Sequence, residues 1–273
     1  PSKSSIMPNT EYDPVPPWAD FELAAKGQKL WLKHILPATY SLGMALFVGM
    51  CIARFAVPLE RGGYGDTGWS ALKRYRRTFF HWLDWIRFPL DTPDSPARKS
   101  IESTRRTHAF ARKMCREVFA DEPGGIEKNG IPISQYDMAE VLWVFALDLH
   151  ICEQFFWDGK RLAKEEREAM VHTWRIIGYY LGVRDEYNVC TSAASLDEYT
   201  AEFLAVLPRR VDTSRPVSVH LRDTAITGFA LWSGLGHEYW RSLFALALKS
   251  GAFNLSHVYS TKNHPYKPPI LPW

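Results

Sequence analysis

Cysteine is scarce in this chain of 273 residues, which contains only four. They stand far apart in the sequence and form no CxxC pair: Cys51, Cys115, Cys152 and Cys190. Four cysteines are too few for a disulfide scaffold, and their spacing excludes the usual zinc and dithiol redox motifs. We therefore expect four reduced or singly buried thiols.

The chain also lacks an excess of charge of either sign. It carries 33 basic and 30 acidic residues, a net charge of +3, which does not predict binding to nucleic acid. Hydrophobic residues make up 46% and charged residues 23%, proportions that are typical of a globular protein and exclude a disordered chain. Aromatic residues are abundant at 14%, with 11 tryptophans, so we expect large buried rings or a wide apolar cavity.

The signature motifs of several enzyme classes are missing. The sequence contains no HExxH, GxGxxG, GxxxxGKS/T or GxSxG motif, and the nearest approach to the last is LWSGL at 231–235. A turn at 60–68 holds four glycines, but no Lys-Ser or Lys-Thr pair follows it. The sequence therefore predicts neither a phosphate loop nor a hydrolase of these standard types.

Long hydrophobic runs are limited to one, the 18 uncharged residues of 35–52. That length is at the lower edge for a membrane-spanning helix, and Pro37, Gly43 and Gly49 make the run a poor candidate. We expect a buried helix here. A membrane span is one alternative, and a helix that lines an apolar site or dips into a bilayer surface is another, so membrane association through 35–52 stays open.

Apolar residues recur with helical spacing through most of the chain, and no run shows the period of two that marks a strand. Ser134 with Asp137, and Ser195 with Glu198, resemble capping boxes at helix starts. The helices expected from this spacing are 21–34, 69–87, 97–119, 134–157, 164–182 and a long region after 216. Gly182 suits the C-cap of the helix expected at 164–182.

The predicted fold class is therefore all-α. We expect a single mostly helical domain over 21–260, preceded by a flexible N-terminal arm at 1–20 and followed by a Pro-rich C-terminal tail at 261–273.

One histidine is a candidate metal ligand. His108 lies in the middle of the helix expected at 97–119, on its inward stripe, with Arg105 and Arg112 about one turn away on either side. An inward imidazole among apolar neighbours is the arrangement that ligates haem iron, and the flanking arginines could hold the haem propionates. The alternative, which spacing alone favours, is a core histidine that bonds to a backbone carbonyl.

A second candidate group lies on the helix expected at 69–87. Arg74, Arg77 and Thr78 are spaced i, i+3 and i+4, so they share one helix face. Three converging polar groups could steady an anion or a bound oxygen molecule. The alternative is a solvated face, because these residues lie opposite the apolar stripe of the same helix.

These two groups together resemble a known family. An RxxRT segment at 74–78, followed thirty residues after its threonine by an H-x-x-x-R helix, is similar to the latex clearing protein (rubber oxygenase) family. The same superfamily holds the membrane-bound fungal oxygenase of mycophenolic acid biosynthesis. The segments 132–145 and 165–188 also resemble the family, in order and at compatible spacing, and the likeness spans roughly residues 20–200.

The resemblance implies a haem b cofactor in a globin-like helical core, with dioxygen as co-substrate. In that case His108 matches the axial ligand of the haem iron, and Arg105 and Arg112 are cofactor-binding residues. Arg112 matches the arginine that follows the histidine by one turn in the family.

The resemblance also implies distal catalytic residues. Arg74, Arg77 and Thr78 match the distal trio of the family, whose middle member in characterised latex clearing proteins is a lysine that caps the iron. Arg77 replaces that lysine, and a guanidinium is a poor iron ligand, so we expect an open or water-held distal position. Glu60 corresponds to the family's distal glutamate base once a small gap is allowed.

The function implied is a haem-dependent oxygenase that cleaves the C=C bond of an apolar terpenoid or lipid-like substrate to two carbonyl products. One alternative is a haem- or lipid-binding protein without oxygenase activity. Another is different haem chemistry of the peroxidase, dehydratase or isomerase type. An electron donor is a further partner that such chemistry allows. The missing secretion signal and the apolar run favour an intracellular, membrane-proximal location.

Overall fold

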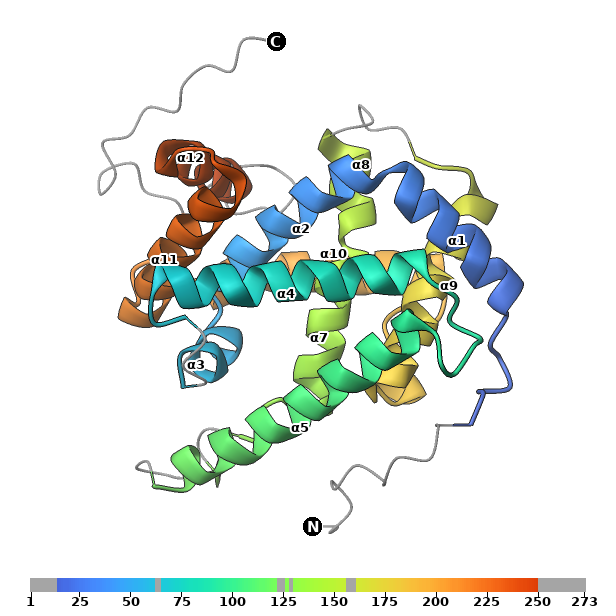
Figure 1. Cartoon of the computed structure of the whole chain (residues 1–273), viewed down its shortest axis with the longest axis horizontal. Helices are drawn as coiled ribbons and strands as arrows, with labels where there is room; N and C mark the ends of the chain where they lie inside the picture. The colour runs from blue at the N-terminus through green and yellow to red at the C-terminus, as the bar shows by residue number, and fades with distance from the viewer. Residues whose placement is uncertain (1–13, 62–64, 122–125, 128–129, 156–160, 250–273) are drawn as a thin grey trace. The chain divides into compact units, whose positions relative to one another are not determined.

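A computed structural model of the chain describes residues 14–61, 65–121, 126–127, 130–155 and 161–249 (Figure 1). Within these ranges the secondary structure is helical, and the only β-type pairing is an isolated bridge between Ile52 and Val211. The predicted all-α fold is confirmed. The helices are α1 (Phe21–Lys33), α2 (Ile35–Gly49), α3 (Ala53–Arg61), α4 (Gly68–Arg87), α5 (Pro96–Asp121), α7 (Gln135–Ala146), α8 (Asp148–Phe155), α9 (Lys164–Leu181), the 3₁₀ turn η1 (Asp185–Tyr187), α10 (Ala193–Arg210), α11 (Pro216–Ser233) and α12 (His237–Lys249).

The helices group into two compact units, and each unit is assembled from three separate stretches of chain. The first unit contains the described part of Pro1–His34 together with Phe80–Trp143 and Leu162–Leu196, and the second contains Ile35–Phe79, Val144–Arg161 and the described part of Asp197–Trp273. Because the two units alternate along the sequence, no linear boundary separates them. The predicted boundaries at 20 and 260 and the globin-like character of the core stay predictions, and the tail at 261–273 lies outside the described residues.

The first unit is built on the close packing of α1 against α9. A Cβ atom at Gly27 would lie only 2.0 Å from the carbonyl oxygen of Ala169, so only glycine allows the two helices to approach this closely. The Thr173 hydroxyl crosses the same contact and lies 3.0 Å from the carbonyl oxygens of Ala24 and Ala169. Gly182, the predicted C-cap of α9, has φ +93° and ends the helix in the left-handed conformation.

Three tryptophans fill the core of this unit. The Trp174 ring contacts the rings of Trp31 and Trp85 edge to face, with centroids 6.1 and 6.3 Å apart. The buried Gln28 amide donates to the carbonyl oxygens of Trp85 and Phe88, both at 2.7 Å, and so satisfies backbone acceptors where α4 ends. These three tryptophans are among the large buried rings that the high tryptophan content predicted.

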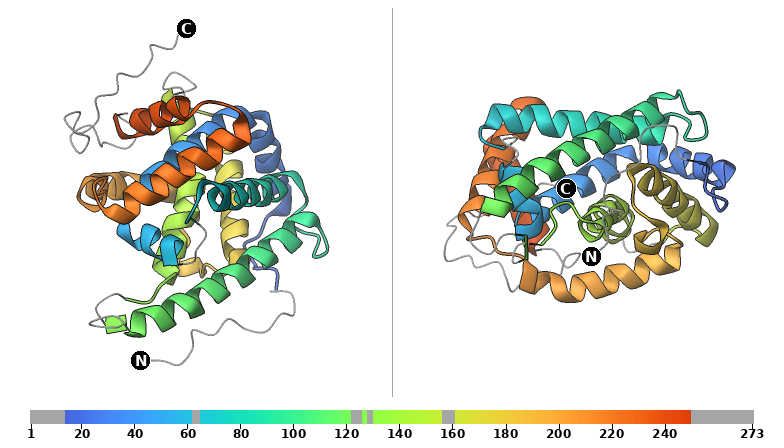
Figure 2. Two further views of the ribbon diagram at one scale, coloured as in Figure 1. Left: turned by 60° about the vertical axis from the view of Figure 1, so that its left-hand side comes forward. Right: turned by 90° about the horizontal axis from the view of Figure 1, so that it is seen from below.

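The helix expected at 97–119 is present as α5, and its two halves are held differently. Its first half packs on α9, where the Arg98 guanidinium stacks 3.2 Å from the centre of the Tyr180 ring. From Glu102 to Met114 every residue is at least partly exposed. Figures 1 and 2 show this second half running away from α9.

Two expectations about helix ends have different outcomes. The capping box of α7 is confirmed, because Asp137 Oδ2 accepts from the Ser134 backbone N–H and hydroxyl, each at 2.9 Å. α10 instead begins at Ala193, two residues before the expected start, since the Ser192 hydroxyl accepts from the Ser195 N–H at 3.1 Å. The helix expected at 134–157 is also divided, into α7 and α8 at Leu147.

The apolar run of 35–52 contributes α2 to the second unit. Phe47 lies between the rings of Phe229 on α11 and Phe244 on α12, with centroids 5.7 and 5.6 Å away. The burial of this helix agrees with the expectation from sequence. Among the described residues no helix combines the length and apolarity needed to cross a membrane.

The helical region expected after 216 is interrupted in the second unit. α11 ends at Gly234, which has φ +72°, and α12 begins three residues later. All four cysteines are buried and none is joined in a disulfide, as expected. Burial raises the pKa of Cys51 and of Cys152 to about 12, so neither is a reactive thiolate near neutral pH.

Candidate functional site

His108 lies on α5 in the first unit. Its side chain is partly exposed, and Nδ1 is shielded from solvent. The predicted inward stripe of this helix is confirmed at its ends, because Ile101 and Cys115 are buried. A partly enclosed imidazole on an otherwise lightly covered helix can act as a ligand once a flat apolar group covers it.

The two arginines beside His108 have different surroundings. Arg105 is partly exposed on the same helix. Arg112 donates from Nε and Nη2 to the carbonyl oxygen of Ile133, at 2.9 and 2.7 Å, and Nη2 lies 3.3 Å from Met138 Sδ. Burial and, less strongly, the neighbouring Arg116 lower the pKa of Arg112. Two of its three nitrogens are thus engaged with the protein, so its predicted contact with haem stays untested.

The predicted distal trio lies on α4 in the second unit. Arg77 is exposed, whereas Arg74 and Thr78 are partly covered. Arg74 Nη1 is buried and has no hydrogen-bond partner among the described residues. A guanidinium nitrogen removed from water without an acceptor is unusual, and it fits a site that receives an anionic or polar group.

Tyr75 anchors this part of α4. Its ring stacks on Phe229 with centroids 5.1 Å apart, and its hydroxyl donates to Met50 Sδ at 3.8 Å. Burial raises the pKa of the Tyr75 phenol, so the phenol stays protonated near neutral pH. A fixed Tyr75 determines the direction in which its neighbours on the helix, Arg74 and Thr78, project.

Glu60 lies in the last turn of α3, also in the second unit, and is partly exposed. α3 packs against α11 there. Residues 62–64, which follow α3, lie outside the described part of the chain. The role of Glu60 as a distal base therefore stays a prediction.

Asp148 is a buried acidic residue that the sequence analysis did not single out. It lies at the start of α8, is fully buried, and neither carboxyl oxygen has a hydrogen-bond partner among the described residues. Burial raises its pKa well above the usual value, because enclosure away from water disfavours the charged carboxylate. The available signal was an acidic residue in an otherwise apolar stretch, VFALDLHI at 144–151.

The first unit offers one nitrogen that suits a haem iron. A haem iron needs only one protein nitrogen, and the His108 imidazole on α5 can provide it. Within the described ranges, no three His, Cys, Asp or Glu side chains gather closely enough to hold a metal ion. The residues present therefore fit a haem in kind.

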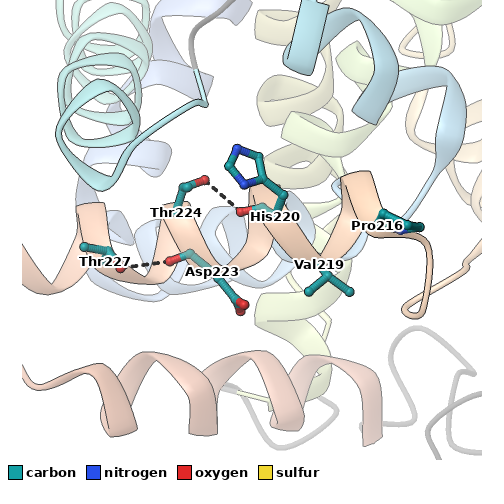
Figure 3. A pocket seen from close by; sticks show the side chains of 6 residues that line it. All are labelled: Pro216, Val219, His220, Asp223, Thr224 and Thr227. Atoms are coloured by element: carbon teal, nitrogen blue, oxygen red, sulfur yellow. Dashed lines mark hydrogen bonds between the residues drawn. The ribbon is translucent and has the colours of Figure 1, made fainter.

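A surface pocket elsewhere in the second unit shares no residue with the predicted sites. Figure 3 shows that its described lining comes from one face of α11, namely Pro216, Val219, His220, Asp223, Thr224 and Thr227. The hydroxyls of Thr224 and Thr227 donate to backbone carbonyls one turn earlier, so they are engaged within the helix. The other polar groups of the lining are the His220 imidazole and the Asp223 carboxylate.

Comparison with known proteins agrees with the motifs. The chain is 28% identical over 183 residues to the rubber oxygenase of Streptomyces sp. (strain K30), a match that covers 65% of this chain and 42% of that protein. The structure of latex clearing protein in its closed state superposes with a TM-score of 0.66 at 20% identity, covering 90% of this chain and 64% of that one. The chain thus spans less than half of the rubber oxygenase and just under two thirds of the solved protein.

A further match is to a family. Residues 34–255 match the model of the family described as ER-bound oxygenase mpaB/B'/rubber oxygenase, catalytic domain, and these residues include every predicted site residue. At that coverage, together with the shared helical fold and the RxxRT and H-x-x-x-R motifs, the chain belongs to the mpaB/rubber oxygenase catalytic-domain family.

Proposed function

We propose that this protein is a haem-dependent oxygenase that cleaves a C=C bond in an apolar terpenoid or lipid-like substrate. The observation that carries the proposal is the position of His108, a partly enclosed imidazole on α5, within a chain of the rubber oxygenase family. Its ring would provide the protein nitrogen that binds the iron of a b-type haem.

A haem bound here would supply the activation of dioxygen. One molecule of dioxygen and one alkene would give two carbonyl products, each with one oxygen atom, so the overall reaction balances without an external reductant. If the protein is purified in its ferric form, one electron must be supplied first, and turnover with and without dithionite tests the need for an electron donor.

The residues of the second unit would act as donors and as a base. Arg77 and Thr78 present a guanidinium and a hydroxyl on one face of α4, and both can donate hydrogen bonds to oxygen. Arg74 Nη1, buried without an acceptor, would hold a polar or anionic part of the bound group. Glu60 would accept an allylic proton from the substrate.

The first test is the cofactor. Purified protein should show a Soret band and give a b-type pyridine haemochrome at about one haem per chain, since one histidine provides the proximal ligand. His108→Ala should abolish stable haem binding, and added imidazole should partly restore it. His172→Ala is the matched control, because His172 is also a partly buried histidine of the first unit. A His108→Ala protein with full haem content and an unchanged spectrum would refute the ligand assignment.

The second test is the reaction. Polyisoprene, squalene and a farnesylated aromatic compound are incubated under ¹⁸O₂, and carbonyl products are measured by mass spectrometry. We expect one ¹⁸O atom in each of two fragments. Haem-loaded protein that produces no carbonyl from any of these substrates would favour a haem- or lipid-binding role. That second candidate is supported by Arg77, where characterised latex clearing proteins carry lysine.

A further inference from the structure

Arg112 links the second half of α5 to the turn that precedes α7 in the first unit. Its Nε and Nη2 atoms both donate to one acceptor, the carbonyl oxygen of Ile133, at 2.9 and 2.7 Å. The same guanidinium lies 3.3 Å from Met138 Sδ on α7. Hydrogen bonds from a charged donor are shorter and stronger than neutral ones, and the planar guanidinium fixes their direction.

The acceptor residue has an unusual backbone conformation. Ile133 has φ +52°, the only positive φ at a non-glycine residue in the described part of the chain. A β-branched side chain strongly disfavours this left-handed conformation, which persists only where the surroundings enforce it. The next residue, Ser134, begins the capping box of α7. The turn at Ile133 is thus held between the start of α7 and the Arg112 side chain.

The contact between Arg112 and Ile133 lies close to His108 on α5. The first half of α5 packs on α9, but from Glu102 to Met114 no residue is fully buried. His108 lies in this lightly packed stretch, and Arg112 follows it by about one helical turn. A contact at Arg112 therefore acts on the part of the helix that carries His108.

We infer that Arg112 is a positioning residue, which fastens the second half of α5 to the turn at Ile133 and so determines where His108 lies. The fastening follows from the contacts of this chain alone, whereas its importance for an iron ligand rests on the proposed function. This role differs from direct contact with the haem, because Nε and Nη2 are already engaged by Ile133.

Hydrogen exchange on the haem-free protein tests the fastening. Arg112→Ala and Arg112→Lys should both raise exchange in peptides covering 103–115 by about ten- to hundredfold, because lysine lacks the two-pronged donor geometry. Peptides from α1 and α9 should not change. Arg106→Ala is the matched control, since Arg106 is an exposed arginine of the same helix that pairs with Glu102. Unchanged exchange at 103–115 in Arg112→Ala would overturn the inference.

Haem retention tests the consequence for His108. Transfer of haem to apomyoglobin should be about tenfold faster or more for both Arg112 variants, and unchanged for Arg106→Ala. If Arg112→Lys retains haem like the wild type while Arg112→Ala does not, the positive charge and not the fastening matters, and the positioning role is refuted. If the wild-type protein takes up no haem, the proposed function fails, and the exchange result alone supports or overturns the fastening.

Discussion

Substitution of Gly27 by alanine is expected to separate α1 from α9 and to destabilise the first unit. The new Cβ would lie 2.0 Å from the Ala169 carbonyl oxygen and 2.3 Å from the Thr173 hydroxyl, whereas Cβ contacts below 3.0 Å essentially never occur. The helices must therefore move apart by at least 1.0 Å. The obstacle is backbone, so no side-chain rotation can relieve it.

The magnitude is a balance of three contributions. Overpacking a close helix contact costs about 1–3 kcal/mol. Weakening the hydrogen bond from Thr173 to the Ala24 carbonyl adds about 1 kcal/mol, because the donor and acceptor lie on the two helices that separate. Alanine returns about 1 kcal/mol through its better helix propensity. The expected net loss in the free energy of unfolding is about 2 kcal/mol.

Urea denaturation followed by far-UV circular dichroism measures this loss. The control is Gly43→Ala on α2, where the nearest atom to the new Cβ is Leu243 Cδ2 at 3.9 Å, an ordinary contact. The control should be as stable as the wild type or up to about 1 kcal/mol more stable, because the propensity gain acts alone. If Gly27→Ala is as stable as Gly43→Ala, the packing argument is wrong.

Three further predictions follow from the buried and polar groups. Asp148→Asn should stabilise the protein at pH 7 by more than about 1 kcal/mol. The pKa of Asp148 is raised in the folded state, so folding becomes less favourable as the pH rises above the pKa of aspartate in the unfolded chain. Urea titrations should show equal stability for the variant and the wild type below about pH 4. His172 accepts a hydrogen bond from the Asp20 N–H at 3.0 Å. Burial and, less strongly, the Arg175 charge lower the pKa of His172, although Asp20 and Glu168 act in the opposite direction. The docking of 14–20 should therefore be complete above about pH 6.5 and weaken as pH falls, measured by hydrogen exchange corrected for intrinsic rates, with no such dependence in His172→Ala. Arg77→Ala should retain haem but turn over at least about tenfold more slowly, and unchanged kinetics would remove Arg77 from the mechanism.

The outcome for Arg112 also changes the interpretation of the motif. The family resemblance assigns this arginine, one turn after His108, to a contact with haem. The structure shows a contact to protein, in which two nitrogens donate to the Ile133 carbonyl oxygen, and the contact with haem stays a prediction. Arg74 Nη1, in contrast, is a buried guanidinium nitrogen with no acceptor among the described residues.

The local features of this protein follow from its sequence. Helical spacing predicted α1, α4, α5 and α9 to within a few residues, and Ser134 with Asp137 predicted the start of α7. Gly182 correctly marked the end of α9. These features depend on hydrogen bonds and side-chain spacing within one or two turns, so they can be deduced from neighbouring residues.

The contacts between distant parts of the chain depend on tertiary packing. Gly27 meets Ala169, and Arg112 meets the strained Ile133, because helices far apart in sequence pack at those points. The burial of Asp148 is also a tertiary effect, since an aspartate at the start of a helix is ordinarily solvated. A local pattern specifies which face of a helix is apolar, but the partner of that face, and the polar groups enclosed with it, depend on the packing of the whole unit.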